Sequence, residues 1–105
     1  MYLGISVSDA ISTSVLEAIA MGAFPIQSNT SCCEEWLVSD QSGFGVLPDD
    51  FDLICDRFLT ALSDDALVDR AAQVNLEIIR SRLAVQVLRP QIQDFYAKAL
   101  AYALQ

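Results

Sequence analysis

The residues best suited to chemistry lie in a small polar segment, Ser8 to Ser14, which runs directly into a predicted helix. Exposed backbone N–H groups and the helix dipole at such a start suit a phosphate group. Asp9 in this segment and Glu17 in the helix are carboxylates, which accept hydrogen bonds from hydroxyl groups such as those of a sugar. The pattern indicates a site for a phosphate and sugar hydroxyls.

Each of these residues also has a structural interpretation. Ser14 and Glu17 have the spacing of a capping box, in which Ser14 caps the helix and Glu17 reaches back to the N-cap amide. Asp9 alone is typical of a turn. The adjacent pair Cys32 and Cys33 has acidic neighbours, and a cysteine needs a positive environment to become reactive. A redox function of this pair is therefore disfavoured.

The composition excludes several classes of protein. The chain of 105 residues contains no histidine, so a Ser-His-Asp triad, a Cys-His dyad and the usual zinc sites are excluded. A net charge of −8 disfavours a nucleic-acid surface, which needs clustered Lys and Arg. The three cysteines lack paired spacing, which favours free thiols. We expect no metal and no bound cofactor.

Length and hydropathy predict one small domain in the cytoplasm. The apolar stretches are shorter than the ~20 residues of a membrane span, and the N-terminus lacks the features of a signal peptide.

Charge is unevenly distributed: residues 1–56 hold nine acids and no Lys or Arg, whereas residues 57–105 hold five acids and all six bases.

Short apolar runs alternate with helical patterns in the first half of the chain. The strands are expected at 2–7, 24–28 and 44–47, and the helices at 14–21, 34–38, 50–62, 65–83 and 85–102. Gly22 is placed to end the first long helix, and Asp49 or Asp50 to cap the helix after the third strand. Pro90 fits the last helix if it falls in the first turn.

This order predicts an α/β fold, a partial Rossmann-like domain of about three parallel strands with crossover helices and a helical C-terminal tail. Residues 1–48 form the βαβ(α)β segment, and residues 49–105 the C-terminal helices. The first strand, apolar throughout, is expected to be buried on both faces. Three strands are fewer than the usual 4 to 6. The single domain therefore looks like part of a larger one.

The stretch SVSDAISTSVLEAIAMGAFPI, residues 6–26, resembles the donor-site signature of retaining GT-B glycosyltransferases of the "glycosyl transferases group 1" family. Asp9 and Glu17 match its acid-x7-acid element, with Asp in place of the first Glu. Ala18, Gly22 and Pro25 also fall in register. The resemblance continues through residues 43–48 and, more weakly, through the C-terminal helices.

The resemblance implies a role for each matching residue. Glu17 is expected to bind the ribose hydroxyls of a nucleotide, and Asp9 to contact the donor sugar. Backbone amides that face the diphosphate map to Ile11, Ser12, Thr13 and Ser14. The implied reaction is metal-independent transfer of a sugar from a nucleotide-diphosphate donor, with retention at the anomeric carbon, to a glycan or lipid-linked acceptor.

The sequence departs from the family pattern at three places. Ala10 replaces the usual Gly after the first acid, and residues 29–33 replace a Gly-rich loop. The Arg and Lys that neutralise the diphosphate in the family lie upstream of the part that matches. Because the first base of this chain is Arg57, a diphosphate beside Asp9 and Glu17 lacks a counter-charge.

We therefore interpret the chain as the carboxy-terminal part of a nucleotide-sugar-binding domain, inactive by itself, that works with the N-terminal portion of such an enzyme. We expect no nucleic-acid partner and no transmembrane segment. The alternative is a non-catalytic α/β module that pairs with itself or another subunit through its exposed sheet edge.

Overall fold

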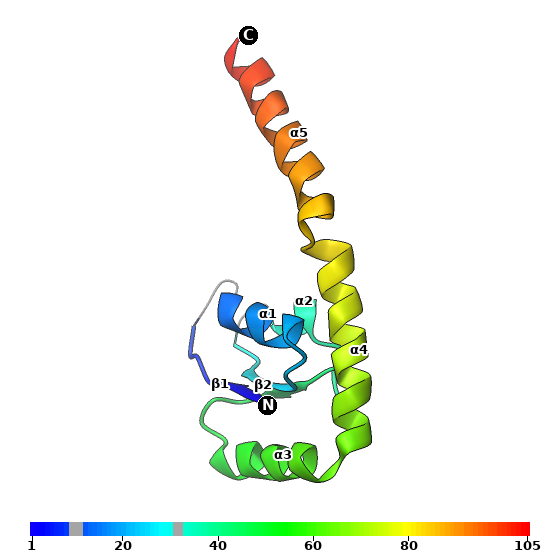
Figure 1. Cartoon of the computed structure of the whole chain (residues 1–105). Helices are drawn as coiled ribbons and strands as arrows, with labels where there is room; N and C mark the ends of the chain where they lie inside the picture. Colours follow the sequence, from blue (N-terminus) through cyan, green and yellow to red (C-terminus); the bar gives the residue numbers. More distant parts are fainter. Residues whose placement is uncertain (9–11, 31–32) are drawn as a thin grey trace.

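The computed structural model describes residues 1–8, 12–30 and 33–105 and shows a three-stranded sheet between helices (Figure 1). The strands are β1 (Tyr2–Gly4), β2 (Pro25–Ser28) and β3 (Phe44–Val46). The helices are α1 (Thr13–Ala20), α2 (Cys33–Trp36), α3 (Phe51–Ser63), α4 (Asp65–Arg82) and α5 (Val85–Ala103). The predicted α/β class and the order of the elements are confirmed.

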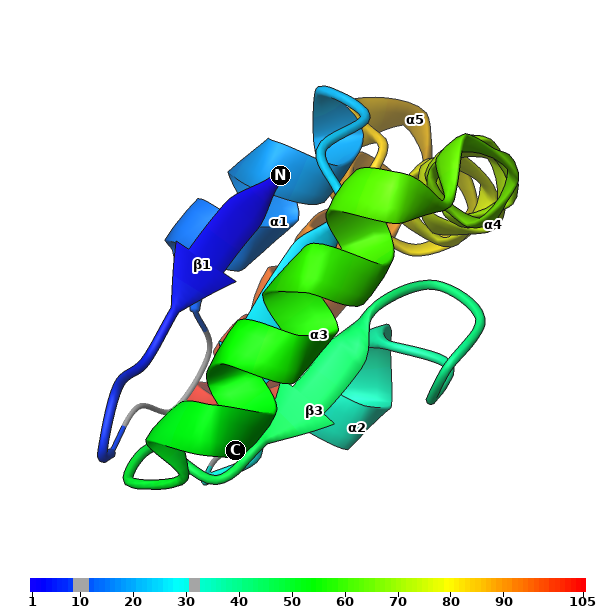
Figure 2. The ribbon, with the colours of Figure 1, turned by 90° about the horizontal axis from the view of Figure 1, so that it is seen from below.

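All three strands are parallel, in the spatial order β1-β2-β3. Tyr2 pairs with Pro25, and Ile26 pairs with Phe44. Helices α1 and α2 lie on one side of the sheet and α3 on the other (Figures 1 and 2). A crossover helix of this kind is what a parallel connection needs, because it must return the chain to the same end of the sheet.

The core lies mainly between the sheet and α3. It consists of seven buried residues from four elements and the segments beside them: Phe24, Ile26, Phe44, Val46, Ile54, Ala61 and Ala71. The Phe24 and Phe44 rings meet edge to face, with their centroids 5.1 Å apart. On the other side of the sheet, α1 buries Val15 and Ile19. Strand β2 is thus covered on both faces, and all four of its residues are buried.

The first strand differs from its prediction. It ends at Gly4 rather than Val7, and it forms an edge of the sheet instead of being buried on both faces. Leu3 is 49% exposed and Val7 79% exposed. The apolar run indicated a strand correctly, but burial on two faces depends on a second neighbouring strand. In this sheet β2 has both neighbours.

Local capping explains where the helices begin and end. Gly22, with a φ of 82°, follows α1 as predicted, a conformation that glycine adopts without strain. Asp50 caps α3 by accepting a hydrogen bond from the Leu53 amide at 3.1 Å. Asp64 does the same for α4, with the Leu67 amide at 2.9 Å. Of the two candidates for the α3 cap, Asp50 is the residue that the structure uses.

Helix α5 leads away from the body of the molecule, whose extents are 58 × 27 × 17 Å (Figure 1). None of its residues is buried. Pro90 lies in its second turn rather than its first, because the extended Ala84 ends α4 and starts α5 at Val85. Proline lacks the N–H that would bond the Gln86 carbonyl, and the exposure of this helix leaves that carbonyl to water.

One buried polar contact fixes α4 against the segment that leads into β3. The Asn75 side chain is fully buried and donates a hydrogen bond to the Ser42 carbonyl at 2.7 Å. The Ser42 hydroxyl, also buried, accepts from the Val38 amide at 2.8 Å. These bonds hold the turn before β3 in place.

In the described part of the chain, no helix is long and apolar enough to cross a membrane.

Candidate functional site

The candidate site lies where the chain passes from β1 into α1. In an open parallel sheet, ligands bind beyond the carboxyl ends of the strands. The described residues of the site are Ser12, Thr13, Ser14 and Glu17. Asp9 and Ile11, the other two predicted site residues, lie outside the described residues, so their predicted roles stay predictions.

The structure does not form the predicted capping box. Helix α1 begins at Thr13 with Ser12 as N-cap, which puts Ser14 at the second helical position and Glu17 at the fifth. A capping box uses the third helical position, so Glu17 lies two residues too far along to reach the N-cap amide. The Ser14 hydroxyl is taken instead by Tyr2, whose hydroxyl donates to Ser14 Oγ at 2.9 Å. The capping explanation of Glu17 is therefore wrong.

The N-terminus of α1 keeps the properties that suit an anion. Ser12 makes no side-chain cap hydrogen bond, and its Oγ lies 3.3 Å from Ser14 Oγ instead. The first turn contains no acidic residue. Thr13 and Ser14 are exposed, so the first amides of the helix face the solvent. The positive end of the helix dipole is consequently not offset by a carboxylate in its own first turn.

Glu17 is exposed and lies one turn further along α1. Among the described residues it makes no side-chain hydrogen bond or ion pair. Its carboxylate is thus available to accept hydrogen bonds from ligand hydroxyls, as the sequence predicts. The structure brings Ser12, Thr13, Ser14 and Glu17 together at one end of one helix.

Two arginines of the described residues are engaged away from this site. The guanidinium of Arg57 lies over the Phe44 ring, 4.8 Å from its centroid, and Phe44 belongs to the core beneath the sheet. Arg82 stacks on Trp36 at 3.9 Å and donates to the Glu35 carbonyl at 2.6 Å. The expected lack of a counter-charge for a diphosphate stays a prediction.

Sequence reasoning missed four polar residues beneath the site. Tyr2, Gln27, Ser28 and Thr30 lie on or after β1 and β2 and hydrogen-bond to residues 6 and 14. A signal was present, because polar residues at the carboxyl end of a buried strand are unusual and β2 reads Pro-Ile-Gln-Ser.

Apart from this site, a hollow of about 260 Å³ lies at the ends of β2 and β3. It is lined by Asn29, Cys33, Glu34, Leu37, Ser39 and Gly45. Burial raises the pKa of the Cys33 thiol, and the negative charge of Glu34 raises that pKa further. A raised pKa lowers the thiolate fraction at a given pH, which agrees with the expectation that the acidic neighbours of Cys33 disfavour a redox function. The described residues hold no cluster suited to a metal ion.

Solved structures include a protein with the same fold. The chain matches part of the sucrose-phosphate synthase from Thermosynechococcus elongatus with a TM-score of 0.81 and 18% sequence identity. The match covers 88% of this chain and 23% of that chain. That protein is a retaining GT-B glycosyltransferase of group 1, so the resemblance seen in the sequence is confirmed for the fold. The chain spans about a quarter of the length of the protein it matches.

Sequence comparisons do not add to this match. No protein-family model matches the chain. No curated protein matches it either.

The environment of Cys33 generates a prediction about pH. Because the folded pKa of Cys33 is raised, its thiolate forms at higher pH than that of an ordinary thiol. Alkylation of Cys33 by iodoacetamide, followed by peptide mass spectrometry, should therefore accelerate at higher pH in the folded chain than in the same chain unfolded in urea. Replacing Glu34 with Gln should move the folded profile toward lower pH. Coinciding folded and unfolded profiles would contradict this assignment.

Proposed function

We propose that the chain is the carboxy-terminal part of the donor-binding domain of a retaining glycosyltransferase. The parent enzyme transfers a sugar from a nucleotide-diphosphate donor to a glycan or lipid-linked acceptor, as in polysaccharide synthesis. The observation that carries the proposal is the N-terminus of α1, which is free of a side-chain cap and of first-turn acids and stands at the carboxyl end of β1. The fold match supports the same assignment.

Each site residue has a definite task in this proposal. The amides of Ser12, Thr13 and Ser14 face the diphosphate, where N–H groups and the helix dipole stabilise negative charge. The Glu17 carboxylate accepts hydrogen bonds from the two ribose hydroxyls. Asp9, carried over from the resemblance, contacts the donor sugar, and Ile11 supplies a further amide. Transfer itself uses no metal.

The chain alone binds the donor weakly and does not catalyse transfer. A helix N-terminus offers about half a positive charge, whereas a diphosphate carries two or more negative charges. Since Arg57 and Arg82 are engaged elsewhere, the remaining positive charge comes from the N-terminal portion of the enzyme. That portion also supplies the acceptor side of the cleft.

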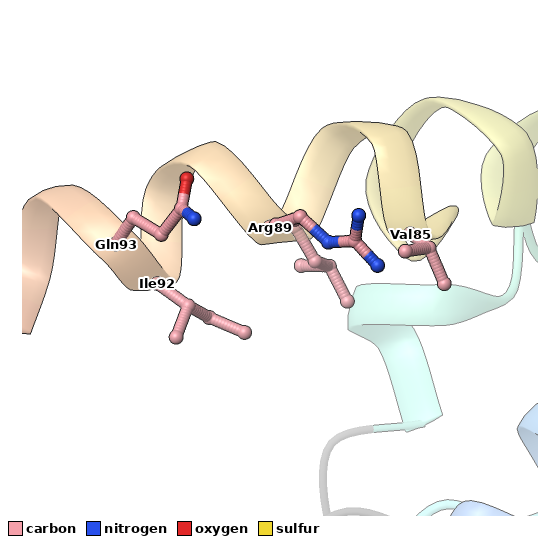
Figure 3. A pocket seen from close by; sticks show the side chains of 5 residues that line it. Val85, Arg89, Ile92 and Gln93 are labelled. Atoms are coloured by element: carbon pink, nitrogen blue, oxygen red, sulfur yellow. The ribbon is translucent and has the colours of Figure 1, made fainter.

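Exposed apolar surface fits a chain that works with more polypeptide. Helix α5 exposes Phe95, Tyr96 and Tyr102, each by at least 66%. Near its start, Val85 and Ile92 lie on the same side of the helix, with Arg89 reaching toward Val85 (Figure 3). Helices in proteins gain most of their stability from packing an apolar face, and α5 buries none of its residues, which supports a covering partner in the working protein.

Nucleotide titration tests the proposed site. Saturation-transfer NMR with UDP and with GDP should detect binding no tighter than about 1 mM, equivalent to about −4 kcal/mol. Replacing Glu17 with Gln should weaken the binding of the nucleotide by a further tenfold or more, because a hydrogen bond to a charged group is lost.

The matched control is Glu77→Gln, which makes the same charge change at an exposed position on α4. It should leave nucleotide binding unchanged. Equal effects of the two substitutions would remove Glu17 from the site. Micromolar binding of UDP or GDP by the unmodified chain would contradict the proposed shortage of positive charge.

The second candidate function is an interaction module, and the free edge of β1 favours it. Beside this edge lies a hollow of about 400 Å³, lined by Leu3 on β1 and by Phe51, Ile54, Cys55, Phe58 and Leu59 on α3. Figure 2 shows β1 at the border of the sheet, beside α3. An unpaired strand beside exposed apolar side chains is a template for another chain.

Self-association through this edge is a separate prediction. In sedimentation velocity the chain should show a concentration-dependent shift toward a dimer. Replacing Leu3 with Lys should abolish the shift, because a charge on an edge strand opposes pairing. The control Leu104→Lys makes the same substitution at a more exposed leucine just after α5, 79% exposed against 49% for Leu3, and should leave the shift in place. A monomer at every concentration would rule out this alternative.

A further inference from the structure

The carbonyl of Ser6, just after β1, accepts two hydroxyl hydrogen bonds from the end of β2. Ser28 Oγ donates to it at 2.6 Å, and Thr30 Oγ1 at 2.8 Å. The Ser6 hydroxyl itself lies 3.5 Å from Gln27 Nε2, within hydrogen-bond distance. A carbonyl oxygen has two lone pairs, so these two donors satisfy it fully. We call Ser28, Thr30 and the Ser6 carbonyl the Ser6 clamp.

The other end of the same connection is fixed as well. Tyr2 donates its hydroxyl to Ser14 Oγ at 2.9 Å, which ties the first turn of α1 to β1. Gly4 makes room for this arrangement: a Cβ at Gly4 would stand 2.1 Å from Gln27 Oε1 and 3.0 Å from the Tyr2 hydroxyl. Ser6, just after β1, and Ser14, in the first turn of α1, are therefore each tied to the strands by side-chain hydrogen bonds.

We propose that Thr30 and Ser28 are positioning residues for donor binding, acting through the Ser6 carbonyl on the connection that leads to Ser12, Thr13 and Ser14. This inference rests on the proposed function. The hydrogen bonds from the two hydroxyls hold Ser6, where the chain leaves the sheet. The hydrogen bond from Tyr2 to Ser14 holds the first turn of α1. With both points fixed, the first amides of α1 keep one position relative to the carboxyl ends of the strands.

Exposure distinguishes Thr30 from a core residue. Ser28 is buried, with 1% of its surface exposed, but Thr30 is an exposed residue. Loss of the Thr30 hydroxyl lets water reach the Ser6 carbonyl, so the whole fold loses little while the local tie is weakened. A local effect without a global one is what a positioning role requires and what a purely structural role would not give.

Hydrogen exchange on the full chain tests the clamp, with Thr30→Val as the variant that removes the hydroxyl and keeps the shape. The protected amide of Leu16, which donates to the Ser12 carbonyl at the start of α1, should exchange about fivefold faster, the equivalent of one net hydrogen bond. The saturation-transfer signal of UDP should weaken in parallel. Thr30→Ser keeps the hydroxyl and should restore both readouts to those of the unmodified chain.

The matched control is Thr60→Val. Thr60 also donates its hydroxyl to a backbone carbonyl, that of Asp56 at 2.9 Å, but within α3 on the other side of the sheet. It should leave the exchange of the Leu16 amide and the UDP signal unchanged.

Three results have distinct meanings. Unchanged exchange in Thr30→Val would overturn the clamp, and so would faster exchange spread evenly over α3 and α4, because that is a loss of global stability. An absent UDP signal in the unmodified chain would overturn the proposed function, whereas the exchange of Thr30→Val and Thr30→Ser would still decide whether the hydroxyl fixes the connection.

Discussion

The burial of β2 on both faces is the constraint on which the rest of the structure depends. All four residues of this strand are buried, with α3 packed below it and α1 above. Its two neighbours, β1 and β3, pair with it in parallel, which aligns the carboxyl ends of the three strands. That alignment brings Ser28 and Thr30 to the Ser6 carbonyl and places the start of α1 at the same end of the sheet.

Local sequence signals predicted most of the fold. Apolar runs and the capping residues Gly22 and Asp50 act over a few residues, so they can be seen in the chain itself. The exposure of β1 could not be seen, because it depends on how many strands the sheet has. The break at the extended Ala84 agrees with the predicted ranges, and with α5 starting at Val85 it puts Pro90 at the sixth helical position, in the second turn.

The residues of the candidate site could be proposed from the sequence, but the hydrogen bonds that hold the neighbouring segments in place could not. The helix start and Glu17 follow from neighbouring residues and from the acid spacing of the resemblance. The Ser6 clamp joins residues 22 and 24 positions apart, and Tyr2 meets Ser14 across 12 positions, so these bonds exist only once the strands pair. The capping box was wrong because α1 starts with Ser12 as N-cap, which puts Ser14 inside the helix.

The central claim is that the N-terminus of α1 receives the diphosphate of a nucleotide sugar. Titration of the ¹⁵N-labelled chain with UDP, followed by amide chemical shifts, tests it residue by residue. The account predicts that the largest shifts fall on the amides of Ser12, Thr13 and Ser14, with a smaller shift at Glu17. Shifts concentrated on α5 or around the hollow at Cys33, with those α1 amides unmoved, would contradict it.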